Sequence, residues 1–186
     1  MRLFLAINLP AEVRREVEAA TATLRDCAPE ISWISAPRLH LTLKFLDEQP
    51  AERVDEIRDA IAGVAGRHRE LLIALGGIGA FPNFRRARVV WMGVMQEPRL
   101  ELLHHDLEVA CEQLGFEVEG RTFRPHLTLA RVKQALPEER LRSLSRAAKQ
   151  TDYRTDFVVR SIDLMNSALG PSGPTYTTLV SAALRS

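Results

Sequence analysis

The tetrapeptide His-Leu-Thr-Leu occurs twice in this chain, and this repetition limits the possible folds more than any other feature of the sequence. The first copy begins at His40 and the second at His126, so nearly half the chain separates them. Each copy follows a proline-marked turn and alternates apolar with polar residues, as a β-strand does. The separation is too long for a solenoid repeat, so the two strands predict two pseudo-equivalent lobes with a cleft between them.

Helical and strand patterns alternate along the rest of the chain. The sequence predicts strands at residues 2–8, 31–35, 39–46, 71–81, 87–94, 121–132, 156–169 and 176–185. It predicts helices at residues 11–26, 50–68, 97–116 and 137–149. Because several strands are consecutive, the order favours an α+β fold with largely antiparallel pairing over a doubly wound parallel sheet. We therefore expect residues 1–186 to form a single bilobal domain with outer helices.

The charge balance argues against long nucleic acid held by a uniform basic field. The 25 Lys and Arg residues are nearly cancelled by 24 Asp and Glu residues, so an anion must be bound locally. Cys27 and Cys111 lie in predicted helices and are interpreted as small buried hydrophobes, which suggests a reducing, cytoplasmic setting. No apolar run is long enough to cross a bilayer, so we expect no membrane insertion. We also expect a monomer.

Strand geometry places the polar side chains of the repeated tetrapeptide on one face. Successive side chains point to opposite faces, so each copy presents its His and Thr on one face and its two leucines on the other. The polar residues are His40, Thr42, His126 and Thr128. An imidazole titrates near neutrality, so one can accept a proton while the other donates one, and threonine hydroxyls can bind phosphate oxygens. A single strand histidine is usually structural, but two matching copies favour phosphoester chemistry, which needs no metal here.

The segments HLTLKFL and HLTLAR, with the opening RLFLAINLP, resemble the two-histidine phosphoesterase superfamily over essentially the whole chain. Within that superfamily the chain looks like the bacterial and archaeal RNA 2′,3′-cyclic phosphodiesterases, also called 2′-5′ RNA ligases. The resemblance implies a bilobal α+β fold with the two motifs facing each other across a central cleft. It also implies hydrolysis of a 2′,3′-cyclic phosphate at an RNA or oligonucleotide end to a 2′-phosphate, without a cofactor.

The same resemblance implies a role for each motif residue. His40 would be the general acid that protonates the departing 3′ oxygen, and His126 the general base that activates water. Thr42 and Thr128 would hold the phosphate.

Two further residues are implied as substrate ligands, and both raise a question of geometry. Phe45 would stack on the nucleobase and Arg131 would bind the phosphate. Each lies five residues past its histidine, which is the wrong parity for the same face of an ideal strand, so the strand must end, twist or bulge there. Periodicity alone favours a core position for Phe45 and a solvated strand end for Arg131.

Several other residues are weaker candidates. Lys44 shares the parity of His40 and could either extend the cleft or lie at the surface, so it is left outside the site. Arg85, Arg86 and Arg88 could guide an RNA backbone, although charges flanking an apolar strand are more often protection against aggregation. His104 and His105 are adjacent on a predicted helix and are interpreted as surface or helix-flank residues.

Alternative functions remain open at this point. The chain could hydrolyse cyclic phosphates of small nucleotides or of ADP-ribose, or mainly run the reverse reaction, which joins a 5′-hydroxyl to a cyclic phosphate. It could also be a catalytically silent module that binds RNA ends. Two histidines that titrate near neutrality favour an enzyme, because binding alone would need only cations.

Overall fold

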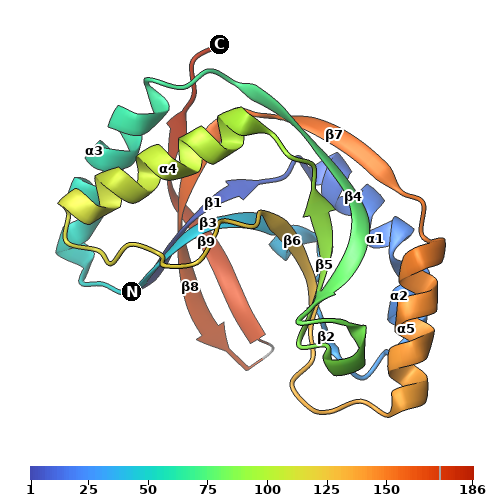
Figure 1. Cartoon of the computed structure of the whole chain (residues 1–186). Coiled ribbons are helices and arrows are strands. Elements are labelled where there is room, and N and C mark those ends of the chain that lie inside the picture. The colour runs from blue at the N-terminus through green and yellow to red at the C-terminus, as the bar shows by residue number, and fades with distance from the viewer. Residues whose placement is uncertain (172) are drawn as a thin grey trace.

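The computed structural model, which describes residues 1–171 and 173–186, contains one nine-stranded sheet (Figure 1). The strands are β1 (Arg2–Asn8), β2 (Ser32–Trp33), β3 (His40–Glu48), β4 (Leu71–Phe81), β5 (Val89–Val94), β6 (His126–Arg131), β7 (Arg154–Val159), β8 (Ser161–Gly170) and β9 (Gly173–Ala183). Their spatial order is β7-β4-β5-β6-β3-β1-β8-β9, and β2 also pairs with β6. All of these pairings are antiparallel, as expected.

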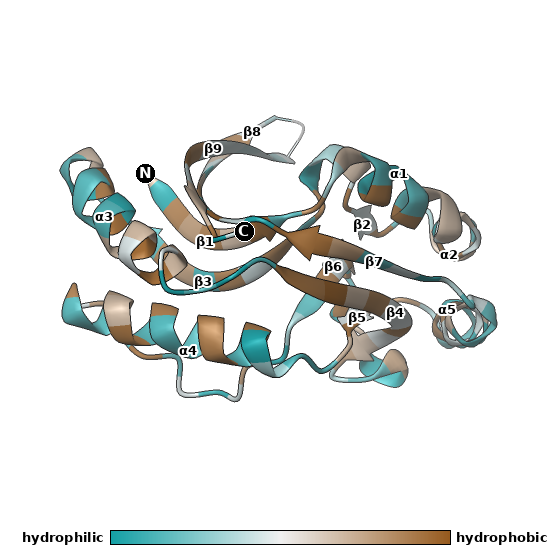
Figure 2. Cartoon of the chain, turned by 90° about the horizontal axis from the view of Figure 1, so that it is seen from above, coloured by the Kyte–Doolittle hydropathy of each residue, from teal (hydrophilic) through white to brown (hydrophobic). Residues whose placement is uncertain are grey.

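Two groups of helices lie at opposite ends of the molecule (Figures 1 and 2). The helices are α1 (Ala11–Ala20), α2 (Ala22–Cys27), α3 (Val54–Ala65), α4 (Pro98–Gln113) and α5 (Glu138–Gln150). Helices α3 and α4 form one group, and α1, α2 and α5 form the other. The expected α+β class with helices outside the sheet is confirmed, and no helix of the described residues is long and apolar enough to cross a membrane.

Three predicted elements were wrong. The strand expected over residues 156–169 divides at Arg160 into β7, which pairs with β4, and β8, which pairs with β1. The helix expected over residues 11–26 divides at Thr21, a fully buried residue whose hydroxyl donates a hydrogen bond to the Val17 carbonyl. The strand expected over residues 121–132 begins only at His126. Pro125 precedes it and has no N–H group to contribute to a strand ladder. Strands β8 and β9 follow each other in the chain, and Ser172 between them lies outside the described residues.

The leucines of the two repeated motifs lie in the core, as their parity predicts. Leu41, Leu43, Leu127 and Leu129 are at most 5% exposed and belong to a continuous apolar cluster. Figure 2 shows hydrophobic residues concentrated in the strands, whereas the helices alternate between hydrophilic and hydrophobic residues. Full burial of one leucine side chain contributes about 1.5–3 kcal/mol, so this packing strongly fixes which face of each strand points inward.

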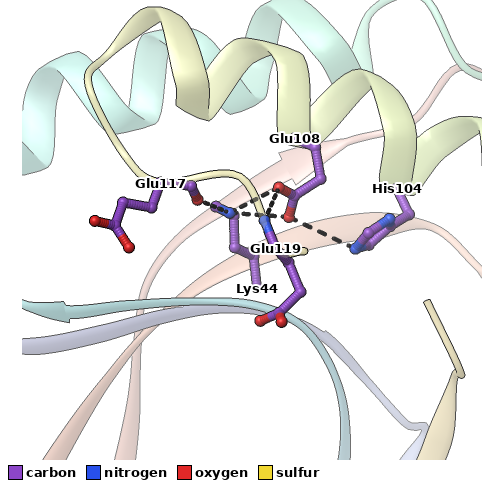
Figure 3. A network of polar contacts seen from close by, with 5 residues as sticks. All are labelled: Lys44, His104, Glu108, Glu117 and Glu119. Atoms are coloured by element: carbon purple, nitrogen blue, oxygen red, sulfur yellow. Dashed lines mark hydrogen bonds and ion pairs between the residues drawn. The ribbon is translucent and has the colours of Figure 1, made fainter. Parts of the chain in front are cut away.

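A buried ion pair attaches helix α4 to strand β3, and backbone groups of the segment after α4 bind to the same pair (Figure 3). Lys44 Nζ lies 2.9 and 2.8 Å from the two carboxylate oxygens of Glu108 and donates a third hydrogen bond to the Glu117 carbonyl. The backbone N–H of Glu119 donates to the same carboxylate over 3.1 Å. Lys44 is 7% exposed and therefore lies neither at the surface nor on the cleft face, which were the two positions considered from sequence.

His104 extends this network toward the second motif. Its Nε2 lies 3.7 Å from a Glu108 carboxylate oxygen, and its ring stacks on Phe123 with centroids 3.7 Å apart (Figure 3 shows the first of these contacts). Phe123 stands three residues before His126, so the stack helps to hold the chain that enters β6. His104 is thus a half-buried packing residue and not the surface residue expected, whereas His105 is exposed.

We expect Lys44→Met to lower the free energy of unfolding by about 3–5 kcal/mol, because it leaves the Glu108 carboxylate buried without its cation. The double variant Lys44→Met/Glu108→Leu should recover much of that loss, because no unpaired charge remains. Urea denaturation followed by circular dichroism measures both. Arg142→Met is the control, since its pair with Glu138 is exposed and should contribute little. Equal losses in the single and double variants would contradict this account.

Candidate active site

The four polar residues of the repeated motifs meet on one face of the sheet. Strands β3 and β6 are neighbours, with Leu41 paired opposite Leu127. Residues directly opposite each other in an antiparallel pair share a face, so the two leucines share the core face. The neighbouring positions, which carry the two histidines and the two threonines, therefore share the other face. This pairing makes the histidines diagonal neighbours, for which Cα atoms lie roughly 7–8 Å apart.

A β-bulge in β3 brings Phe45 to the same face. Between Thr42 and Lys44, β3 advances two residues while β1 advances one, so Leu43 is an extra residue in the strand. The bulge turns Lys44 to the core side and returns Phe45 to the face of His40. The Phe45 ring is 58% exposed there. The expected departure from ideal strand parity is confirmed at this position.

Strand β6 contains the equivalent bulge. Between Thr128 and Ala130, β6 advances two residues while β5 advances one, so Leu129 is the extra residue. As a result Arg131 is exposed on the face that carries His126. All six residues predicted from sequence therefore lie on one face, although two of them would point away if the strands were regular.

Both imidazoles are held by the same backbone contact. His40 Nδ1 lies 2.8 Å from the Arg38 carbonyl, and His126 Nδ1 lies 2.7 Å from the Arg124 carbonyl. A carbonyl only accepts hydrogen bonds, so in each ring Nδ1 carries the hydrogen. No hydrogen bond to Nε2 of either ring occurs among the described residues, so Nε2 is available to exchange protons. The sequence repeat also extends beyond four residues, because an arginine stands two positions before each histidine. This shared arginine could have indicated from sequence that the two strands begin in the same way.

Aromatic rings also pack edge-on against both imidazoles. The Tyr176 ring from β9 lies 5.0 Å from the His40 ring at 85°, and the Phe81 ring from β4 lies 5.0 Å from the His126 ring at 87°. Phe4 from β1 adds a second, tilted contact to His40. Sequence reasoning missed these three rings, because nothing near the motifs indicates which distant strands will pack there.

A cavity of about 360 Å³ adjoins His40, and we call it the polar pocket. Its lining includes Asn8, Arg14, Arg38, His40, Asp163 and Ser181. Strands β1, β8 and β9 provide the floor, whereas Arg14 comes from α1 and Arg38 from the short 3₁₀ helix Ala36–Arg38. Sequence reasoning did not single out Arg14, Asn8 or Asp163, since none lies in a recognisable motif.

The electrostatic surroundings of His40 favour its neutral form. Burial lowers the pKa of His40, and the positive charges of Arg14 and Arg131 lower it further, although the hydrogen bond to the Arg38 carbonyl opposes them. The two guanidinium groups are thus close enough to act on the ring. A negatively charged ligand beside His40 would offset them and favour the imidazolium.

A second cavity, also of about 360 Å³, adjoins His126, and we call it the aromatic pocket. Its lining includes Phe81, Trp91, Gly93, Phe123, Arg124 and His126. The Trp91 indole lies across Gly79, where a Cβ atom would stand 2.3 Å from the ring. Glycine at position 79 therefore permits this placement of the ring.

The other basic candidates are exposed and lie outside both pockets. Arg85 and Arg86 are exposed in the 3₁₀ helix Phe84–Arg86, and Arg88 is exposed just after it. None of them lines either of the two pockets.

Comparisons with known proteins identify the family of this chain. A family model described as the 2′-5′ RNA ligase superfamily matches residues 9–171. An RNA 2′,3′-cyclic phosphodiesterase from Methanocaldococcus jannaschii is 32% identical over 95% of this chain and 96% of its own length. One from Geobacillus stearothermophilus is 31% identical over 97% of this chain, which spans 56% of that protein. The crystal structure of TT0787 from Thermus thermophilus superposes with a TM-score of 0.80 and 31% identity, covering 100% of this chain and 98% of that one.

We expect Arg14→Gln to raise the pKa of His40, because the substitution removes a nearby positive charge that disfavours the imidazolium. A proton NMR titration of the His40 ring measures this pKa directly and does not depend on activity. Arg15→Gln is the matched control, because it removes the same charge from an exposed position on α1. An unchanged pKa in Arg14→Gln would show that the guanidinium does not act on the ring.

Proposed function

The chain belongs to the 2′-5′ RNA ligase superfamily and is an RNA 2′,3′-cyclic phosphodiesterase, and we propose that His40 and His126 perform the two proton transfers of its reaction. The observation that carries this proposal is the pairing of β3 with β6, which sets both motifs on one face at neighbouring positions. A free Nε2 on each ring supports it, because each nitrogen can take or give one proton.

In the proposed reaction, His126 Nε2 takes a proton from water while the water oxygen bonds to phosphorus. The bond between phosphorus and the 3′ oxygen breaks, and His40 Nε2 delivers its proton to that oxygen. The product is a 2′-phosphate with a free 3′-hydroxyl. Positioned acid and base groups each contribute about 10²–10⁴-fold in rate, and neither transfer requires a metal.

The assignment of His40 as the acid places a condition on the substrate. Because burial and two arginines lower the pKa of His40, the free enzyme favours the neutral ring. The negative charge of a bound cyclic phosphate counteracts the arginines and favours the protonated ring that the reaction needs. A lowered pKa also makes the imidazolium a stronger acid toward the departing oxygen.

The remaining residues of the face have roles in holding the substrate. Thr42 and Thr128 offer hydroxyl groups to the non-bridging phosphate oxygens. Arg131 can bind the phosphate through two parallel hydrogen bonds, and its electrostatic effect on His40 supports this placement. Phe45 presents an exposed ring on which a base can stack, an interaction that contributes roughly 1–3 kcal/mol.

Ligation is a second candidate activity, and the aromatic pocket favours it. An attacking oxygen approaches phosphorus opposite the leaving oxygen, which places the nucleophile on the side of His126. A water occupies only about 30 Å³, whereas the cavity there measures about 360 Å³ and includes Phe81, Trp91 and Phe123. A nucleoside with a 5′-hydroxyl could stack in this space and replace water, giving a 2′-5′ phosphodiester.

We expect His40→Ala and His126→Ala each to lower kcat for a cyclic-phosphate-ended oligonucleotide by about 10²–10⁴-fold, because each removes one proton transfer. The parent should show a bell-shaped dependence of kcat/KM on pH, and each variant should lose one limb. Circular dichroism confirms that the variants are folded. Parent-like turnover in either folded variant, or tight binding of the cyclic phosphate without turnover by the parent, would contradict the assignment.

We expect Trp91→Ala to lower the ratio of joined to hydrolysed product by about tenfold, because stacking in the aromatic pocket assists a nucleoside and not water. The measurement supplies a cyclic-phosphate-ended strand and a 5′-hydroxyl strand together and separates the products by electrophoresis. Leu102→Ala, at an exposed position on α4, is the control. If Trp91→Ala left the ratio of joined to hydrolysed product unchanged, the 5′-hydroxyl strand would not bind in the aromatic pocket.

A further inference from the structure

The polar pocket contains cationic groups to which the proposed reaction gives no part in binding the cyclic phosphate. Arg14 and Arg38 both line it, and Thr178 and Ser181 contribute hydroxyl groups from β9. The cavity opens directly beside His40, and its volume of about 360 Å³ leaves space beyond a single bound water. The Ser181 and Thr178 hydroxyls already donate to Asp163 and to the Met165 sulfur, so the two guanidinium groups are what suits this cavity to an anion.

The acidic residue in this pocket, Asp163, acts on Arg14 through its charge, but it forms no ion pair with Arg14 or Arg38 among the residues that the structure describes. Asp163 is 4% exposed and lies in the floor. One of its oxygens accepts a hydrogen bond from the Asn8 amide over 2.8 Å, and the other accepts from the hydroxyls of Ser161 and Ser181 over 3.0 and 2.6 Å. Its carboxylate is therefore engaged in holding the strands of the floor together.

Arg14 is held in place but keeps unused donors. Its Nη1 donates to the Pro37 carbonyl over 2.8 Å and its Nη2 to the Asn8 side-chain oxygen over 2.9 Å. Each of these nitrogens carries two hydrogens, so one N–H on each remains for a ligand. Fixed in this way, the guanidinium loses little further freedom when it binds an anion.

Arg38 is held by a similar pair of contacts. Its Nε lies 3.1 Å from the Ser35 hydroxyl oxygen, and its Nη1 lies 3.3 Å from the Pro174 carbonyl. No hydrogen bond from its Nη2 occurs among the residues that the structure describes, so both hydrogens of that nitrogen are available.

The aromatic pocket on the other side of the centre has the opposite character. Glu97 and Glu101 line it together with Arg124, so its carboxylates outnumber its guanidinium group. The ion pair between Arg99 and Glu97 offsets one of these carboxylates, and Glu101 faces Arg124 as the other charged group of the lining. The polar pocket, with two guanidinium groups and one carboxylate, therefore suits a second negative charge on the substrate better than the aromatic pocket does.

We propose that the polar pocket is a second phosphate subsite, in which Arg14 and Arg38 bind the phosphate on the 5′ side of the nucleoside that carries the cyclic phosphate. This inference rests on the proposed function, in which His40 protonates the 3′ oxygen. The ribose must then lie on the side of His40, and its 5′ oxygen leads away from the reacting phosphorus toward the next phosphate. The subsite selects strand ends over cyclic mononucleotides that lack this phosphate.

Three substrates test the proposal: adenosine 2′,3′-cyclic phosphate, the same compound with a 5′-phosphate, and the dinucleotide ApA ending in a 2′,3′-cyclic phosphate. We expect KM of the parent enzyme to be about tenfold lower for the second and third compounds than for the first, because a charge-assisted hydrogen bond contributes on that scale. Arg14→Gln should raise KM for these two toward the value for the first. Arg15→Gln is the matched control, and it should leave all three KM values unchanged.

The outcomes separate this inference from the function on which it rests. Equal KM values for the three compounds in the parent, or an equal loss of kcat/KM for all three in Arg14→Gln, would overturn the second subsite while leaving the phosphodiesterase assignment intact. A lower KM for the 5′-phosphorylated mononucleotide but not for the dinucleotide would overturn the inference that the subsite selects strand ends. No turnover of any cyclic phosphate by the parent would instead refute the proposed function. Arg14→Lys, which keeps the charge, should retain part of the KM advantage and serves if Arg14→Gln does not fold.

Discussion

The antiparallel pairing of Leu41 with Leu127 is the contact on which the arrangement of the reactive groups depends. Because side chains alternate with a period of two, a shift of either strand by one residue would turn its histidine and threonine into the core and its leucines toward solvent. Leucine burial therefore stabilises the fold and also fixes the register that places two imidazoles side by side. The free energy of leucine burial therefore both stabilises the fold and aligns the two strands of the site.

The two histidines make the same backbone contact but have different surroundings. Each ring is bonded to the carbonyl two residues before it, meets one aromatic edge, and is followed by a bulge at the same offset. Beyond these shared parts, His40 adjoins a pocket with two arginines, whereas His126 adjoins aromatic rings and carboxylates. Two identical side chains can thus take unlike roles, because the charge around them differs.

Much of this arrangement could be predicted from one sequence, because it follows from strand periodicity. The α+β class, the inward leucines and the shared face of each His and Thr all come from alternation within a few residues. The bulges were expected only because Phe45 and Arg131 had the wrong parity for a role that a resemblance implied. Lys44 shows the limit of this reasoning, since an ideal strand puts it beside His40 and the bulge reverses it. Arg14, Trp91 and Tyr176 reach the site through long-range pairing and helix packing, and no local pattern encodes those contacts.

The continuity of the sheet also bears on how the enzyme moves. Strands β3 and β6 belong to different halves of the chain, yet they are hydrogen-bonded neighbours within one ladder sequence that runs from β7 to β9. Separating the halves at this point would break the pairing of Leu41 with Leu127 and expose buried leucine side chains, each of which contributes about 1.5–3 kcal/mol when fully buried. The two imidazoles are therefore already neighbours in the sheet, without a movement of one half of the chain onto the other.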